Sequence, residues 1–74
     1  MLQRLGDFIT VAKIIEIVGS SKKSWVDAIQ EALKRASKTI RNIRGIDVIG
    51  QKAVVDKGKI VEYRVVLKLA FGVE

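Results

Sequence analysis

The stretch VEYRVVLKLAF, residues Val61–Phe71, carries the most regular hydrophobic pattern in this chain of 74 residues. Every second side chain in it is apolar, and a period of two is typical of a β-strand with one buried face. The intervening side chains form the opposite face of that strand, and they are Glu62, Arg64, Val66, Lys68 and Ala70. We therefore predict a strand over Ile60–Phe71 that has one dry face and one mixed face.

Three other segments have the composition of regular elements. Phe8–Val18 (FITVAKIIEIV) is rich in β-branched residues and is followed by Gly-Ser-Ser, which predicts a strand that ends in a loop. Ser24–Asn42 has apolar residues at steps of three and four, which predicts a helix. Ile46–Val55 predicts a second strand with a bulge at Gly50, and a tight turn joins it to the last strand.

The predicted helix has signals at both ends. Ser24 with Asp27 three residues later resembles a capping box, and Ser21 is an alternative cap. Gly45 is a plausible stop signal beyond the other end. The apolar stripe of this helix consists of Trp25, Ala28, Ile29, Ala32, Ala36, Ile40 and Ile43. Because a residue on such a stripe is normally packed, we expect Trp25 to be an aromatic of the core or of a subunit contact.

This order of elements predicts an α+β fold of the type β-α-β-β. One helix returns the chain to its starting end, so the first two strands point the same way, and the tight turn reverses the third. If the last strand lies between the other two, the result is a three-stranded antiparallel sheet packed on one helix. The mixed face is then either solvated or joined to other subunits. We expect residues 8–74 to form this single domain and residues 1–7 to be an N-terminal extension.

The size of the chain favours self-association. A domain this small buries only about 60% of the surface that its unfolded chain exposes, so its core is marginal without help. The chain has no Cys, which excludes disulfides and thiolate metal sites, and no His, which removes the commonest zinc ligand and general base. Self-association is the aid that remains, and we expect no enzymatic activity.

The charge balance suits an anionic partner. Lys and Arg number 14 against 8 acidic residues, so the net charge is +6 and the pI is near 10.0. This balance is also common on an ordinary solvated surface. Lys34, Lys38 and Arg41 fall on one predicted helical face, which is compatible with binding to nucleic acid. No aromatic residues lie between these charges to stack on bases, so nucleic acid is an alternative partner rather than the leading one.

Neither a membrane segment nor a signal peptide is evident. No apolar run reaches the roughly 18 residues of a membrane span. The N-terminal sequence MLQRLGDFIT lacks the apolar region and cleavage site of a secretory signal. We therefore expect a cytoplasmic protein without membrane contact.

The order, spacing and length of these segments carry a family likeness over most of the chain. The residues involved are Lys13, Glu16, Val18–Ser21, Ser24–Trp25, Ala28, Ala32, Arg35–Ala36, Lys38–Ile40, Val61–Val65 and Leu67–Phe71. In this arrangement the chain resembles the dodecins. The resemblance implies a β-α-β-β subunit with its sheet wrapped on the helix, and a hollow, near-spherical homododecamer of cubic symmetry.

The resemblance also implies a flavin pocket between subunits, with two departures. In dodecins a Trp after the helix stacks on the isoalloxazine, and a Gln on the last strand bonds to the polar edge of the flavin. Gly45 stands at the Trp position and offers no π-face, whereas Arg64 stands at the Gln position and has donors but no acceptor. Such a chain keeps the storage shell but binds FMN, riboflavin or FAD weakly, binds another anionic cofactor, or binds nothing.

Three residues are the candidate ligand contacts. Besides Gly45, Arg64 is suited to bidentate binding of a phosphate or carboxylate, although an ion pair between subunits, with Glu62 or another carboxylate, is the favoured alternative. Lys52 lies where some dodecins carry a basic residue near the phosphate tail of the flavin. A metal would have to be bound by carboxylates, hence Ca²⁺ or Mg²⁺ at subunit contacts, so a purely structural oligomer with a divalent cation is a further alternative.

Overall fold

The computed structural model describes residues 12–72, which form three strands and one helix. In chain order these elements are β2 (Ala12–Ser21), α1 (Trp25–Ala36), β3 (Ile43–Asp56) and β4 (Lys59–Gly72). The predicted β-α-β-β order is therefore confirmed. Residues 1–7, and the part of the first predicted strand that precedes Ala12, lie outside the described residues.

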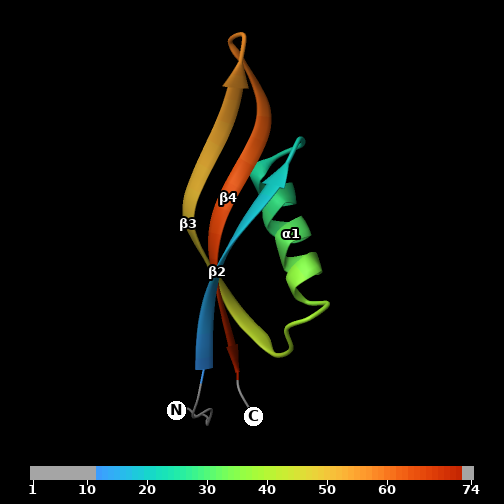
Figure 1. Ribbon diagram of the computed structural model, residues 1–74, viewed down its shortest axis with the longest axis vertical. Coiled ribbons are helices and arrows are strands. Elements are labelled where there is room, and N and C mark those ends of the chain that lie inside the picture. Colours follow the sequence, from blue (N-terminus) through green and yellow to red (C-terminus); the bar gives the residue numbers. More distant parts are fainter. Residues whose placement is uncertain (1–11, 73–74) are drawn as a thin grey trace.

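The strands form one antiparallel sheet in the order β2-β4-β3, with β4 in the centre. This arrangement confirms the prediction that the last strand lies between the other two. Figure 1 shows α1 along one face of the sheet, while the hairpin of β3 and β4 extends well beyond the helix. The helix packs on β2 and β4, and β3 is an edge strand. We call the face of the sheet opposite α1 the open face.

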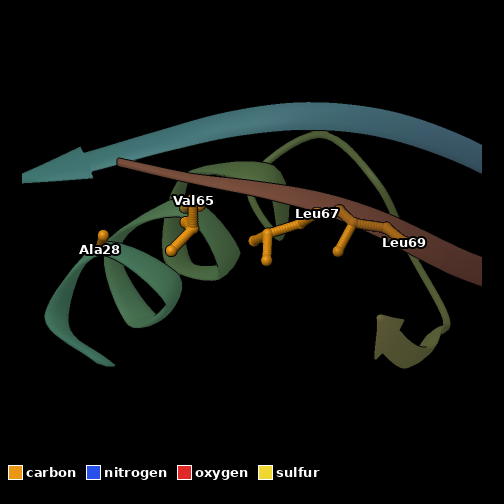
Figure 2. Packing of buried hydrophobic residues seen from close by; sticks show 5 residues of the cluster. Ala28, Val65, Leu67 and Leu69 are labelled. Carbon is orange, nitrogen blue, oxygen red and sulfur yellow. The ribbon is translucent and has the colours of Figure 1, made fainter. Parts of the chain in front are cut away.

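The core lies between α1 and the centre of β4. Val65, Leu67 and Leu69 are fully buried, and they pack with Ala28 and Ala32 of the helix. Figure 2 shows these side chains of β4 pointing towards the helix. They are three of the alternating apolar residues that predicted the dry face, so that prediction is confirmed.

The helix is too short to cover the whole strand. The 12 residues of α1 span about 18 Å at 1.5 Å per residue, whereas the 14 residues of β4 span about 46 Å at 3.3 Å per residue. The dry face is therefore sealed only in its middle, and Val61 near the hairpin stays 44% exposed although it belongs to the same alternating set.

Close contact between helix and sheet depends on small residues. A Cβ atom on Gly19 would lie 2.8 Å from the carbonyl oxygen of Ala28 and 2.8 Å from the Cβ of Ala32. Gly19 pairs with Val65 inside β2, so the predicted loop after Val18 is wrong. The strand continues through Ser21, and Gly19 is the position in it where the helix comes too close for a side chain.

The N-terminal cap of the helix is confirmed. The Oγ of Ser24 accepts a hydrogen bond from the backbone N–H of Asp27 at 2.9 Å. The Asp27 carboxylate does not mirror this bond but accepts one from the hydroxyl of Ser21 at 2.6 Å, and that hydroxyl also accepts the N–H of Lys23 at 2.9 Å. Both candidate caps therefore contribute, and they tie the end of β2 to the first turn of α1.

The predicted C-terminal end of the helix is wrong. The helix ends at Ala36 rather than Asn42, and the N–H groups of Thr39 and Ile40 both turn back to the carbonyl of Ala36. Asn42 adopts a positive φ of 62°, so a left-handed residue occurs in the connection before Gly45, the expected stop. The apolar spacing misled the prediction because Ile43 reaches the same core from a strand.

The second predicted strand is longer than expected and has the expected irregularity. β3 begins at Ile43, so Gly45 lies inside the strand and does not stop the helix. The pairing register with β4 shifts between Val48 and Gly50, which confirms the predicted bulge. Within residues 12–72, the helix is too short and too polar to cross a bilayer.

Candidate functional site

The register of the sheet places Arg64 beside Lys52. Arg64 on the central strand pairs with Lys52 of β3 on one side and with Ser20 of β2 on the other. Directly paired residues have Cβ atoms about 4.5–5.5 Å apart and point to the same face. Two of the three predicted ligand contacts are therefore neighbours on the open face.

Two cations in direct register repel each other, and one carboxylate offsets part of this repulsion. The Arg64 Nη2 atom donates to the Oε1 of Glu62 at 3.3 Å, two residues away on the same face. Glu62 is thus the ion-pair partner of Arg64 within one chain, whereas we had expected this pair to form between subunits. Lys52, Arg64 and Glu62 together carry a net charge of +1, which suits one anionic group.

The hydrogen bond from Arg64 is the main cause that lowers the pKa of Glu62 below its ordinary value. The charge of Arg64, the hydroxyl of Ser20 and the charge of Lys22 act in the same direction, while partial desolvation opposes them. Glu62 is therefore held as a carboxylate, and it competes with any ligand anion for Arg64.

Trp25 holds the backbone of Lys52 from the helix side of the sheet. Its indole N–H donates to the carbonyl oxygen of Lys52 at 2.9 Å, a contact between residues 27 apart in sequence. The ring also meets Tyr63 edge to face, with centroids 4.9 Å apart and an angle of 77°. Trp25 packs against the core from the helix side, as predicted, and so lies on the face away from Arg64. No local sequence pattern indicated its bond to Lys52.

Gly45 does not join the other two candidates within one chain. It pairs with Ala70, which lies six residues from Arg64 along β4, or about 20 Å at 3.3 Å per residue. Nothing lies within 4 Å of the position that a Cβ on Gly45 would occupy. A ligand site containing all three residues therefore requires a second copy of the chain.

The three cations that were predicted to share one helical face do not belong to one helix. Lys34 belongs to α1, but the helix ends at Ala36, so Lys38 and Arg41 lie in the connection to β3. The prediction that these three cations form one face of the helix, on which nucleic acid could bind, is therefore wrong. Among residues 12–72, moreover, there is no group of three or more His, Cys, Asp and Glu side chains that could hold a metal ion.

The sequence profile of the dodecin family matches residues 11–74. The chain belongs to the dodecin family. The calcium dodecin of Mycobacterium tuberculosis is 39% identical over 62 residues, which cover 84% of this chain and 87% of that protein. The dodecin of Thermus thermophilus is 38% identical over 64 residues, or 86% of this chain and 93% of that protein.

Solved dodecin structures have the same fold. The dodecin of Streptomyces coelicolor superimposes with a TM-score of 0.83 at 30% identity, covering 86% of this chain and 91% of that one. The structure of the M. tuberculosis protein, described as a calcium-chelating antigen with a novel calcium-binding site, gives a TM-score of 0.77 at 37% identity. It covers 88% of this chain and 93% of that one. Membership of the dodecins supports a small, oligomeric ligand-binding protein.

Proposed function

We propose that this dodecin assembles into a hollow homo-oligomer of about twelve chains and holds an anionic small molecule between subunits through Arg64 and Lys52. The observation that carries the proposal is the direct pairing of these two cations on the open face. Because only one carboxylate among residues 12–72 is paired with them, a phosphate or carboxylate of a ligand has a complementary charge to meet there.

The apolar rows of the open face support assembly. Ile14 and Val18 of β2 are 65% and 66% exposed, and they pair with Ala70 and Val66 of β4. These apolar rows alternate along the sheet with the charged rows of Lys68 and Arg64. A thin sheet with such a face gains stability when further copies cover it.

The same geometry argues that flavin binding is weakened. Gly45 supplies no aromatic face, and each lost stacking contact removes about 0.5–1.5 kcal/mol beyond the buried area. Arg64 donates to Glu62 and has no acceptor atom for the N–H of a flavin ring. FMN, riboflavin or FAD is therefore expected to bind weakly or not at all, and another anionic cofactor is the better candidate.

The test combines light scattering, the absorption spectrum of the purified protein and titration with FMN. We expect a mass near twelve chains, no flavin absorption, and weak quenching of added FMN. Replacing Gly45→Trp and Arg64→Gln together should strengthen FMN binding at least tenfold. A monomer in solution would refute the assembly, and tight FMN binding by the unchanged chain would refute the altered pocket.

The anion contact has its own test. Arg64→Ala should weaken the binding of inorganic phosphate about tenfold or more, because a charge-assisted hydrogen bond is lost. Lys34→Gln, which removes a charge from the outer surface of α1, is the matched control and should leave the affinity unchanged. Equal losses in both variants would show that phosphate senses only net charge.

A calcium-bound structural oligomer is the second candidate, favoured by the name of the M. tuberculosis relative. Since no sufficient carboxylate cluster exists within residues 12–72 of one chain, Ca²⁺ would need side chains of several copies. This candidate requires the mass or the melting temperature to change when EDTA replaces Ca²⁺. Nucleic-acid binding stays an alternative that requires affinity for a duplex or single strand to fall steeply with salt.

A further inference from the structure

An open hollow lies between the end of α1 and the beginning of β3. Its volume is about 820 Å³, and it follows the connection that swings away from the sheet after the helix. Figure 1 shows this connection as the yellow-green segment below α1. The hollow is some 20 Å along the sheet from Arg64, because Gly45 in its wall pairs with Ala70. It is therefore separate from the Arg64 and Lys52 site of the same chain.

The inner wall of the hollow is aliphatic. Its apolar side chains are Leu33, Ile40, Ile43 and Ile46. Ile43 and Ile46 pack against the core on one side and are only partly buried, so their other side faces the hollow. Gly45 lines the hollow with its backbone, and a Cβ at this position would point to the open face, on the side of Ala70. An alkyl or flat apolar group can therefore lie along this aliphatic wall.

The rim of the hollow is cationic. Arg41 and Arg44 both line it and are both exposed. Within residues 12–72 neither has a carboxylate at ion-pair distance, and the sequence holds no acidic residue between Glu31 and Asp47. Lys13 lies with Arg41 around an adjoining hollow, which adds to the positive potential. Arginine pairs of this kind suit bidentate contact with carboxylate or phosphate.

We propose that this hollow binds an anionic amphiphile. Its aliphatic part lies on the wall formed by Leu33, Ile40, Ile43 and Ile46, and its carboxylate or phosphate head meets Arg41 and Arg44. The combination is specific, because a purely apolar ligand would leave the arginines unused and a purely ionic one would leave the wall bare. The proposal does not depend on Arg64, Lys52 or flavin.

Calorimetric titration of the native oligomer with hexanoate, octanoate and decanoate, each below its micellar concentration, tests the apolar wall. We expect the affinity to rise about two- to fourfold for each added methylene, as partial to full burial of a CH₂ group predicts. Octanol, which has no charge, measures how much the anionic head group contributes to the affinity. Octyl phosphate measures whether a phosphate binds better than a carboxylate. Octanol should bind at least tenfold more weakly than octanoate, and the stronger of the two anions identifies the head as carboxylate or phosphate.

Substitutions then assign the binding to this hollow. Arg41→Gln with Arg44→Gln should lower the affinity for octanoate tenfold or more, whereas Lys23→Gln with Lys34→Gln, the same change of charge elsewhere on the helical side, should leave it unchanged.

Three results would overturn the proposal. They are an affinity independent of chain length, an equal loss in both charge variants, and no binding to the native oligomer. The last result would mean that another copy of the chain covers the hollow. Arg41 and Arg44 are exposed, and the light-scattering mass of each variant is measured. A loss of binding without a change in mass is therefore distinguishable from a failure of the assembly.

Discussion

The contact of Gly19 with the helix makes a quantitative test of how this subunit holds together. In Gly19→Ala the new Cβ would lie 2.8 Å from the Ala28 carbonyl oxygen and from the Ala32 Cβ, and 3.3 Å from Cγ2 of Val65. The carbonyl belongs to the backbone of α1 and cannot rotate away. The helix must therefore retreat by about 0.6 Å to restore an ordinary contact of 3.4 Å.

The cost of that movement follows from the packing of the core. A gap of about 0.5–1 Å removes roughly a quarter to a half of the van der Waals attraction across it. The gap opens over the centre of the only fully buried part of the sheet among the described residues, where Val65 and Leu67 meet the helix. Overpacking of this kind costs about 1–3 kcal/mol. The smaller entropy of an unfolded chain with Ala offsets about 0.4–1 kcal/mol, so we expect a net loss of about 1–2 kcal/mol.

Gly50→Ala is the matched control for this substitution. Its Cβ would meet only Val66, at the ordinary distance of 3.7 Å, in the same sheet. This variant should be neutral or more stable by about 0.5–1 kcal/mol. Urea unfolding followed by circular dichroism, at one fixed protein concentration because assembly contributes to stability, measures both free energies of unfolding. Equal stability of the two variants would refute the close approach of helix and sheet.

Two further predictions concern the row of Arg64 and Lys52. Carboxyl NMR titration should give Glu62 a pKa below its ordinary value, and Arg64→Gln should raise it, since the main cause of the shift is then gone. Because the pKa of Glu62 is lower in the folded than in the unfolded protein, its ion pair stabilises the fold at pH values above the unfolded pKa. This contribution is lost as the pH falls through the folded pKa. An unchanged pKa of Glu62 in the Arg64→Gln variant would contradict this assignment. Trp25→Phe keeps a ring beside Tyr63 but loses the bond to the Lys52 carbonyl, and should lower the free energy of unfolding by about 0.5–1.5 kcal/mol in the same urea assay. Faster amide hydrogen exchange near Lys52 should accompany this loss, and an exchange rate equal to that of the unchanged chain would speak against the tether.

The alternation from Val61 to Phe71 was sufficient to predict β4 as a strand with one buried face, and it agreed with a central place in the sheet, which the strand order then showed. Because side chains on a strand point alternately to opposite faces, the buried set of Val65, Leu67 and Leu69 can be predicted before any partner is known. The N-cap at Ser24 and the bulge at Gly50 are equally local, since each depends on a few neighbouring residues. Such features can be predicted from short segments of the sequence.

The residue at which the helix ends could not be predicted from neighbouring residues alone. Ile40 and Ile43 continue the helical spacing, but Ile43 pairs with Phe71 in the sheet and packs against the core from β3. Gly19 looked like part of a loop because glycine is rare inside strands, and only the closeness of Ala28 explains why it is needed there. In both cases a contact distant in sequence outweighed the local preference.

The candidate site divides in the same way. The sequence by itself determined the strand that carries Arg64, the place of Glu62 on the same face of that strand, and the excess of positive charge in the chain. Only the tertiary structure decided that Lys52 faces Arg64 across the sheet, that Trp25 holds the backbone of Lys52, and that Gly45 lies at the other end beside a separate hollow. The physical reason is register: pairing between strands is fixed by the turn, the bulges and the packing of the whole sheet, and none of these is contained in the segment that bears the charged residue.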